Sequence, residues 1–318
     1  MNYPMRETAL AVRRRDDGGL VLRQYITDEE LVLDREQAKL FYRLDGKTDP
    51  FSVPTKLSPQ EVMSFLEALD EGEFIRWSWK RRLLPGTVMY TVWVPQRTRR
   101  LSRIARIYSL LLRLLWLPTL IAGVYLYTRA KPSSSVVGTF VGLGVGLFCG
   151  VVLHELSHGM VGIANGLRLF ESGLMLWHFL PGAYVLMDVD RMRLGLKRVQ
   201  VLAAGVEMNL LLAGVSLLAS GLTGLCGGLG FGIATNNILL AAMNLSLVKG
   251  FDGWRIMTTL LGTKELSLLP DRRTRSTMKQ GGTVGRVYLL SQYVIFALQI
   301  LLPVVLILNV LELIGVIR

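Results

Sequence analysis

Two patterns of hydrophobic and polar residues divide the chain near residue 98. Before this point charged and apolar residues alternate, and no long apolar run occurs. After it, apolar runs cover residues 104–127, 136–163, 201–222, 227–247 and 287–317. An α-helix needs roughly 20 residues to cross a bilayer. The pattern predicts a polytopic α-helical membrane protein of about five spans over residues 99–318, with a small domain over residues 1–98. A soluble protein with a very apolar core is the alternative.

Residues 1–98 carry short-range signals for strands, helices and a hairpin. ALAVRRR at 9–15 and LVLRQYI at 20–26 have strand character. Helices are expected over 34–46 and 58–72. Ser58 is placed to cap the second helix, with Glu61 three residues later as in a capping box and Gly72 after its end. Residues 73–80 and 87–94 alternate in period two, which predicts a β-hairpin. This α+β order of elements is winged-helix-like.

The expected second helix argues against nucleic acid as a partner. A winged helix often binds DNA, but phosphate binding requires a basic surface. This helix instead carries acidic residues: Glu61, Glu67, Asp70 and Glu71. An extended peptide that adds to a strand edge is the better candidate ligand. A purely structural domain is the alternative.

An irregular insert is expected between the second and third spans. Residues 167–192 are apolar but are interrupted by Pro181, Gly182, Asp188 and Asp190. We expect a sheet-like or re-entrant segment near the membrane surface, with residues 169–190 as an edge for a substrate strand.

Charge sets the expected orientation. The 318-residue chain is 51% hydrophobic and has a formal net charge of +12. Basic residues gather in the segments before the first span and after the second and fourth: Arg97, Arg99, Arg100, Arg103, Arg106, Arg168, Arg191, Arg193, Lys197, Arg198, Arg272, Arg273, Arg275, Lys279 and Arg286. Cytoplasmic loops are enriched in Lys and Arg. We therefore expect an integral membrane protein with a cytoplasmic N-terminus, and the lipid bilayer accounts for the basic charge without nucleic acid.

The second span holds two of the three histidines of the chain, in the stretch HELSH at 154–158. Residues four apart lie on one helix face, so His154 and His158 can both point at one metal ion. Glu155 is placed to act as a general base toward a water molecule at that ion. This is the spacing of the HExxH zinc motif. Ionisable residues within a span are costly and usually functional. A histidine–glutamate cluster satisfied by hydrogen bonds between helices is the alternative.

A catalytic zinc ion requires a third protein ligand and one open position. Asp252 is the preferred candidate, because it lies at the inner end of the fourth span and Gly253 beside it permits close backbone approach. His178 in the insert is the competitor, as an alternative ligand or a gate residue.

Three motifs together resemble the site-2 protease family of intramembrane zinc metalloproteases. They are HELSH, AAGVEMN at 203–209 and NLSLVKGFDG at 244–253. The family pairs HExxH with a Gly-Pro-x-x-Asn stretch and an Asn-x-x-Pro…Asp-Gly stretch, in this order on three core spans. The resemblance covers residues 136–262.

The resemblance implies a role for each matching residue. His154, His158 and Asp252 match the zinc ligands, and Glu155 matches the general base. Asn209 and Asn244 match asparagines that help to hold substrate or the developing oxyanion. Hydrogen bonding between helices is the alternative role for both asparagines.

The motifs depart from the family pattern at three positions. Val206 and Leu247 replace prolines, and Glu207 adds a carboxylate to the third span. These departures leave the ligands intact and bear on how a substrate strand would be held.

FLPGAYVLMD and VKGFDGW resemble one branch, the peptide zinc metalloproteases found beside bacterial peptide-maturation and export systems. Residues 18–95 resemble, more weakly, the peptide-recognition domains of enzymes that modify ribosomal peptides.

The resemblance implies an intramembrane zinc metalloprotease in a bacterial cytoplasmic membrane. Its expected substrate is a membrane-associated peptide or a single-span protein, with leader removal in ribosomal-peptide maturation as one expected role. The alternatives are a non-catalytic binding or immunity protein on the same scaffold, a regulatory protease in transmembrane signalling, and a metal transporter.

Overall fold

The structure is a computed structural model. It describes residues 3–24, 29–77, 80–81, 87–95, 98–177, 180–189, 192–246 and 251–261, and the single residues 282, 301, 304, 308 and 311. The chain forms two compact units. Unit 1 comprises Met1–Gln96, Leu169–Pro181 and Leu186–Asp188, and unit 2 comprises Arg97–Arg168, Gly182–Val185 and Val189–Arg318. Most of the insert between the second and third predicted spans therefore groups with the N-terminal unit.

Unit 1 contains a three-stranded antiparallel sheet and two helices around one apolar core. The sheet order is β2 (Leu10–Arg14), β3 (Leu20–Gln24) and β4 (Glu30–Leu33). The helices are α1 (Arg35–Arg43) and α2 (Pro59–Glu71), with a short 3₁₀ turn, η1 (Pro50–Ser52), between them. Leu22, Phe41 and Leu69 are among the buried residues of the core. Both expected helices and both expected N-terminal strands are confirmed, whereas β4 was missed.

Side-chain caps explain where the two helices of unit 1 begin. Ser58 accepts a hydrogen bond from the Glu61 N–H (3.3 Å), and the Glu61 carboxylate accepts one from the Ser58 N–H (2.7 Å). This confirms the predicted capping box. Asp34 and Gln37 form a second capping box at α1. These bonds satisfy backbone N–H groups that the first helical turn leaves without partners.

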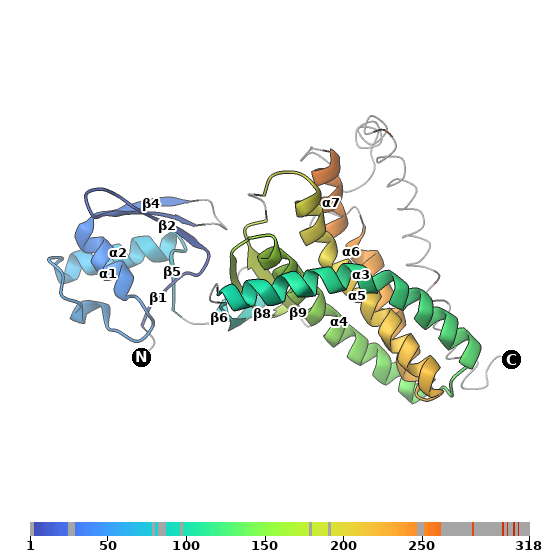
Figure 1. Cartoon of the computed structure of the whole chain (residues 1–318). Helices are drawn as coiled ribbons and strands as arrows, with labels where there is room; N and C mark the ends of the chain where they lie inside the picture. The colour runs from blue at the N-terminus through green and yellow to red at the C-terminus, as the bar shows by residue number, and fades with distance from the viewer. Residues whose placement is uncertain are drawn as a thin grey trace. The chain divides into compact units, whose positions relative to one another are not determined.

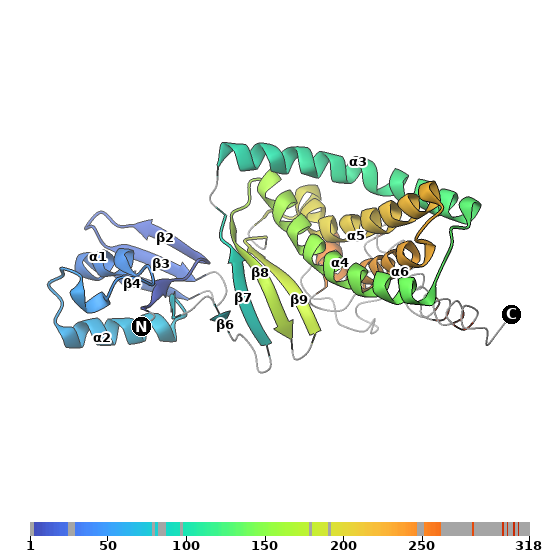
Figure 2. The ribbon, with the colours of Figure 1, turned by 90° about the horizontal axis from the view of Figure 1, so that it is seen from below.

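The predicted hairpin forms only in part, because its strands find partners far away in the sequence. β5 (Ile75–Arg76) pairs with β1 (Met5–Arg6). β6 (Lys80–Arg81) pairs with β7 (Thr87–Trp93) over two residue pairs. The long partner of β7 is β8 (Leu169–Trp177), and the four-stranded order is β6-β7-β8-β9 with β9 at Leu180–Met187 (Figure 2). The insert is therefore sheet-like, as expected, but a local pattern could not reveal the β7–β8 pairing.

A buried ion pair joins β8 to β5. Arg76 Nη1 lies 2.8 Å from Glu171 Oε2, and Thr8 Oγ1 donates to the same oxygen at 2.7 Å. Arg76 and Glu171 are both buried. Breaking such a pair leaves a buried charge without its partner, which is strongly destabilising. The insert is thus tied into unit 1 by both backbone pairing and charge.

Unit 2 is helical (Figure 1). Three of the described helices are long and apolar enough to cross a membrane: α3 (Arg99–Ala130), α4 (Val136–Ala164) and α5 (Leu196–Thr223). α6 (Gly227–Asn244) covers most of the fourth expected span, 227–247, but is not among these three helices, and it packs against α4 and α5. The short helix α7 (Asp252–Leu261) packs on α5. Of the five expected spans, three are therefore present as long apolar helices in the described part of the chain. The fifth expected span lies outside the described residues, except for single positions.

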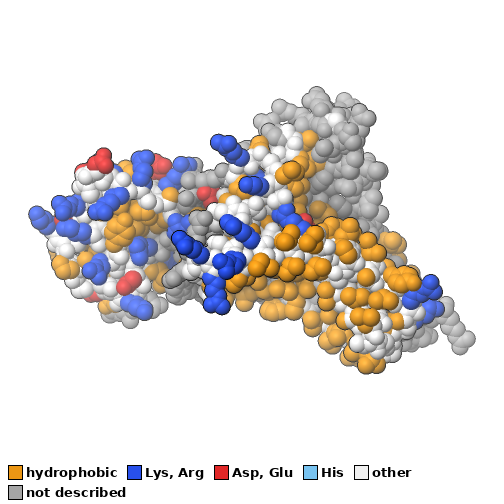
Figure 3. All heavy atoms as spheres, in the orientation of Figure 1, with side chains coloured by type: hydrophobic (Ala, Val, Ile, Leu, Met, Phe, Trp, Pro, Cys, Tyr) orange, Lys and Arg blue, Asp and Glu red, His pale blue; other side chains and the backbone are white. Residues whose placement is uncertain are grey.

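The outer surface of the long helices is apolar. Exposed side chains on α3 and α4 include Leu114, Ile121, Val137, Phe140 and Phe148. In Figure 3 hydrophobic side chains gather over the middle and C-terminal part of α3 and the helices beside it, whereas Lys and Arg side chains lie toward the ends of α3. Monomeric soluble proteins rarely expose apolar patches of this extent, and the surface suits a lipid environment.

Glycines allow the helices of unit 2 to approach closely. A Cβ on Gly142 of α4 would overlap the Leu229 carbonyl oxygen of α6, and one on Gly123 of α3 would overlap the Gly214 carbonyl oxygen of α5. Small residues at such contacts are typical of helix packing in membranes, where close approach maximises van der Waals contact.

Candidate metal centre and peptide groove

The two histidines of α4 face one point, as their spacing predicts. The Nε2 atoms of His154 and His158 lie 3.1 Å apart, and both side chains are buried, at 5% and 8% exposure. Asp252, at the start of α7 and 9% exposed, brings its Oδ2 atom to 3.1 Å from His154 Nε2 and 3.0 Å from His158 Nε2. The structure therefore brings together the three residues expected as ligands.

The three ligand atoms form a nearly equilateral triangle that fits a metal ion. A tetrahedral zinc ion with bonds of about 2.0–2.1 Å separates its ligand atoms by roughly 3.3 Å. The observed separations of 3.0 and 3.1 Å are close to this value. Two imidazole nitrogens and one carboxylate oxygen also form a donor set that transition metals accept. Among the described residues, this is the group of His, Cys, Asp and Glu side chains that could hold a metal ion.

Hydrogen bonds at the far side of each imidazole ring orient its Nε2 atom toward the triangle. His158 Nδ1–H donates to the Val201 carbonyl oxygen of α5 at 2.7 Å. His154 Nδ1–H donates to the Oδ1 atom of Asn209, also on α5. A neutral imidazole that donates through Nδ1 presents a lone pair at Nε2. The two Nε2 lone pairs and a carboxylate oxygen then face one another, an arrangement that favours a cation at the centre.

Two glycines leave room for this arrangement. A Cβ at Gly205 of α5 would overlap the His154 ring. A Cβ at Gly253 would overlap the backbone of Leu245, so this glycine permits the close approach that was expected beside Asp252. Both glycines lie within the AAGVEMN and NLSLVKGFDG motifs. Packing around the candidate ligands therefore requires glycine at both Gly205 and Gly253.

Glu155 follows the first ligand on α4 and is half-buried. A carboxylate adjacent to a ligand is suitably placed for proton transfer to or from a molecule bound at the centre.

The two motif asparagines occupy different environments. Asn209 is fully buried and hydrogen-bonds His154. Asn244 is half-buried, and its amide donates to the Leu240 carbonyl oxygen of its own helix at 2.9 Å. Within the described part of the chain, no hydrogen bond joins Asn244 to the ligands. His178 and Leu247 lie outside the described residues.

The other two departures from the family pattern lie on α5. Val206 is buried. Glu207 is half-buried.

Asn237 of α6 was not predicted as a site residue from the sequence. It is fully buried, and its Oδ1 atom accepts a hydrogen bond from Asn209 Nδ2 at 2.9 Å. A signal was available, because Asn236 and Asn237 interrupt an apolar run, and polar residues in such runs commonly form hydrogen bonds between helices.

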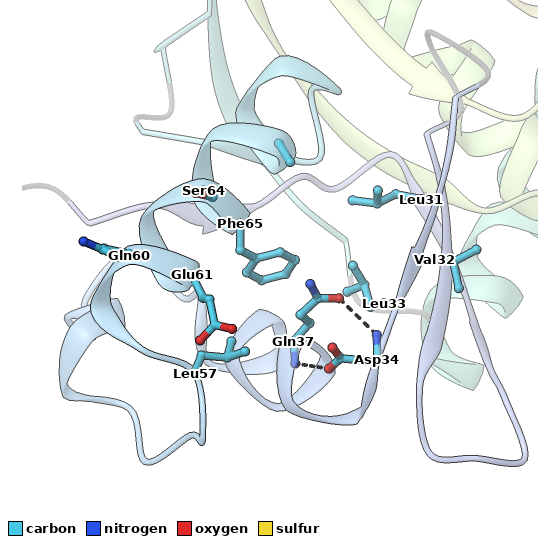
Figure 4. Close-up of a pocket in the computed structure, with 11 residues that line it drawn as sticks. Leu31, Val32, Leu33, Asp34, Gln37, Leu57, Gln60, Glu61, Ser64 and Phe65 are labelled. Carbon is cyan, nitrogen blue, oxygen red and sulfur yellow. Dashed lines mark hydrogen bonds between the residues drawn. The ribbon is translucent and has the colours of Figure 1, made fainter.

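A groove in unit 1 lies between β4 and the helix α2. It has a volume of about 410 Å³. Phe65 projects from α2 toward Leu31 and Leu33 of β4, and Glu61 lies at one end (Figure 4). β4 is an edge strand of the described sheet. The groove lining mixes these apolar side chains with polar ones, among them Gln37, Gln60 and Ser64. An extended peptide can add to a sheet at an edge strand that lies beside such a groove.

No family model, curated protein or solved structure matches this chain.

Proposed function

We propose that the chain is an intramembrane zinc metalloprotease that hydrolyses a peptide bond in a membrane-associated peptide or transmembrane segment. The proposal includes a site-2-protease-like core of about five spans, a cytoplasmic N-terminus and a place in a bacterial cytoplasmic membrane. The observation that carries it is the buried triangle of His154, His158 and Asp252 with Glu155 beside it.

Zinc is the proposed ion because of the ligand set. Three protein ligands of the His and Asp type, with one position left for a water or substrate, are typical of catalytic zinc sites. Structural zinc sites instead use four protein ligands, often with cysteine. Cys149 and Cys226 are both exposed and are not part of this group. A zinc ion held there would supply a Lewis acid that polarises a peptide carbonyl and makes water more acidic.

The proposed chemistry of the chain's own residues is acid–base catalysis by Glu155. Its carboxylate takes a proton from the attacking water as oxygen bonds to the peptide carbonyl carbon. It then gives that proton to the departing amine nitrogen as the C–N bond breaks. His154, His158 and Asp252 hold the ion and do not exchange protons with the substrate.

A transmembrane substrate must lose its helical hydrogen bonds before it is cut, because protease sites act on extended backbone. In the membrane each unsatisfied backbone group costs several kcal/mol. A strand edge can replace these bonds. β9 ends the order β6-β7-β8-β9 and is the proposed edge for this purpose. The groove beside β4 is the proposed recruitment site for a second, extended part of the substrate.

The test is cleavage by purified protein in proteoliposomes. Zinc-loaded wild type and Glu155→Gln are each incubated with a library of single-span peptides that carry cytoplasmic extensions, and products are identified by mass spectrometry. We expect new peptide termini with the wild type and none with the variant. Products that form equally with both would contradict the proposal. Metal binding without cleavage of any library member would favour a non-catalytic binding protein instead.

A further inference from the structure

The metal ligand His154 lies at one end of a buried chain of hydrogen bonds that crosses three helices. His154 Nδ1–H on α4 donates to Asn209 Oδ1 on α5. Asn209 Nδ2 then donates to Asn237 Oδ1 on α6 at 2.9 Å. Asn237 Nδ2 donates to the Ile233 carbonyl oxygen at 2.9 Å and, at 3.3 Å, to the Gly146 carbonyl oxygen of α4. Both asparagines are fully buried.

This series of hydrogen bonds determines which end of the Asn209 amide meets His154. An asparagine amide presents an acceptor on one side and two N–H donors on the other. If Asn209 turned its Nδ2 atom toward His154, that ring would need its lone pair at Nδ1 and its N–H at Nε2. An N–H at Nε2 would point at Asp252 and could not ligate a metal. The acceptor on Asn237 removes this alternative, because it requires Nδ2 of Asn209 on its own side.

Asn237 is itself oriented by backbone. Its Nδ2 atom meets two carbonyl oxygens, which accept hydrogen bonds and cannot donate them. Oδ1 of Asn237 must therefore face Asn209. Gly150 of α4 makes this contact sterically accessible, since a Cβ there would lie 2.6 Å from Asn237 Oδ1 and 3.3 Å from Asn209 Nδ2.

We propose that Asn237 is a positioning residue of the metal centre: through Asn209 it directs the Nε2 lone pair of His154 at the ion. Asn237 does not touch the ion or a substrate. This inference rests on the proposed metal centre, but it does not depend on protease activity. It also gives Asn209 a role as a partner of a ligand, which is different from holding an oxyanion.

The neighbouring Asn236 offers a matched control. Its Nδ2 atom donates to the Leu143 carbonyl oxygen at 2.7 Å, so it also ties α6 to α4. Asn236 forms no hydrogen bond to Asn209 in the described structure. A variant at Asn236 therefore removes a bond between the same two helices without changing the orientation of Asn209.

The experiment measures zinc dissociation constants by chelator competition on the purified full chain, together with the visible spectrum of the cobalt(II)-loaded protein. Asn237→Leu keeps a similar volume but has no acceptor, and we expect zinc affinity to fall about ten-fold and the cobalt spectrum to change. Outer-shell partners of metal ligands typically contribute 10–100-fold in affinity. Asn236→Leu should leave both the affinity and the spectrum as in the wild type.

A conservative variant separates positioning from helix packing. Asn237→Asp keeps an acceptor toward Asn209, and as a buried neutral acid its O–H takes the place of the amide donor toward the carbonyl oxygens, so it should retain wild-type zinc affinity and spectrum if positioning is the role. If Asn237→Asp and Asn236→Leu lower the zinc affinity as much as Asn237→Leu does, Asn237 acts through helix packing and the inference is wrong. Wild-type affinity in Asn237→Leu would also overturn it. Asn237→Ala is used in the same way if Asn237→Leu does not fold.

Zinc binding by the wild-type protein tests the proposed metal centre separately from the role of Asn237. Absence of zinc binding in the wild-type protein would contradict the metal centre itself. Tight wild-type binding that Asn237→Leu leaves unchanged would contradict only the role of Asn237.

Discussion

The Nε2 atom of His158 and the Oδ2 atom of Asp252 lie 3.0 Å apart, although 94 residues separate them in the chain. One belongs to α4 and the other to the start of α7. With His154 they form the buried triangle on which the proposed metal centre depends.

Removing either side of this pair should remove the metal. We expect about one zinc per chain in the wild type, and His158→Ala and Asp252→Ala should each lower zinc affinity by more than the roughly 10–100-fold typical of outer-shell changes. Elemental analysis and chelator competition measure this. His178→Ala is the matched control, since it removes the remaining histidine and should leave zinc bound. Loss of zinc in His178→Ala with retention in Asp252→Ala would reverse the assignment of the third ligand.

Glu155→Gln should separate metal binding from catalysis. The amide is nearly the same size as the carboxylate but cannot take a proton from water. We expect full zinc occupancy with cleavage reduced by about 10²–10⁴, the range that general acid–base groups contribute. Glu207→Gln changes another half-buried carboxylate of unit 2 and should leave zinc bound. Unchanged cleavage in Glu155→Gln would exclude Glu155 as the general base.

Gly205→Ala should damage the metal centre through a single methyl group. The added Cβ would overlap the His154 ring and force it away from Asp252. Because a ligand is displaced, we expect zinc affinity to fall at least about ten-fold. Gly144→Ala is the control, since a Cβ there meets nothing within 4 Å. Equal zinc affinities in the two variants would show that helices α4 and α5 adjust to the added group without moving the ligand.

The groove of unit 1 can be blocked from its exposed side. Ser64 is an exposed residue of α2 that lines the groove. If a peptide binds there, Ser64→Trp should raise the KM for a cleaved substrate several-fold and leave kcat unchanged, because recruitment is separate from the chemistry. Met63→Trp places the same side chain at the next exposed position of α2, outside the groove lining, and should have no effect. A fall in kcat alone would argue against recruitment at this groove.

The capping box of α2 should make its first turn sensitive to acid. The Ser58 N–H donates to the Glu61 carboxylate and lowers the pKa of Glu61 below its usual value near 4.5. A lowered folded-state pKa gives a stabilisation that is complete above the unfolded value and is lost as pH falls through the folded value. Amide hydrogen exchange in the first turn of α2, recorded as a function of pH, measures this loss of stabilisation.

Glu61→Gln retains a cap but removes the titrating group, so wild type and variant should differ above about pH 5 and converge in more acidic solution. Glu67→Gln, in the middle of α2, should leave exchange in the first turn unchanged. A constant difference at every pH would mean that the charge of Glu61 does not contribute.

Several features of the fold were predictable because they depend on short segments. The capping box of Ser58 and Glu61 needs residues three apart, and the common face of His154 and His158 needs residues four apart on one helix. The length and hydropathy of α3, α4 and α5 are likewise read along one segment. The apolar run at 227–247 was expected to be a span, but α6 is not among the three helices of sufficient length and hydropathy. Its glycines and asparagines suit packing between helices better than contact with lipid.

Sequence by itself therefore predicted the long apolar helices of unit 2, the common face of the two histidines, and Asp252 as the preferred third ligand with His178 as the alternative. Only the tertiary structure decided that β7 pairs with β8, that Arg76 neutralises Glu171, and that Asn237 lies behind Asn209. These relationships join residues from 28 to 95 positions apart. Each arises because a buried polar group or strand edge must find a partner, and the fold determines which group lies within reach.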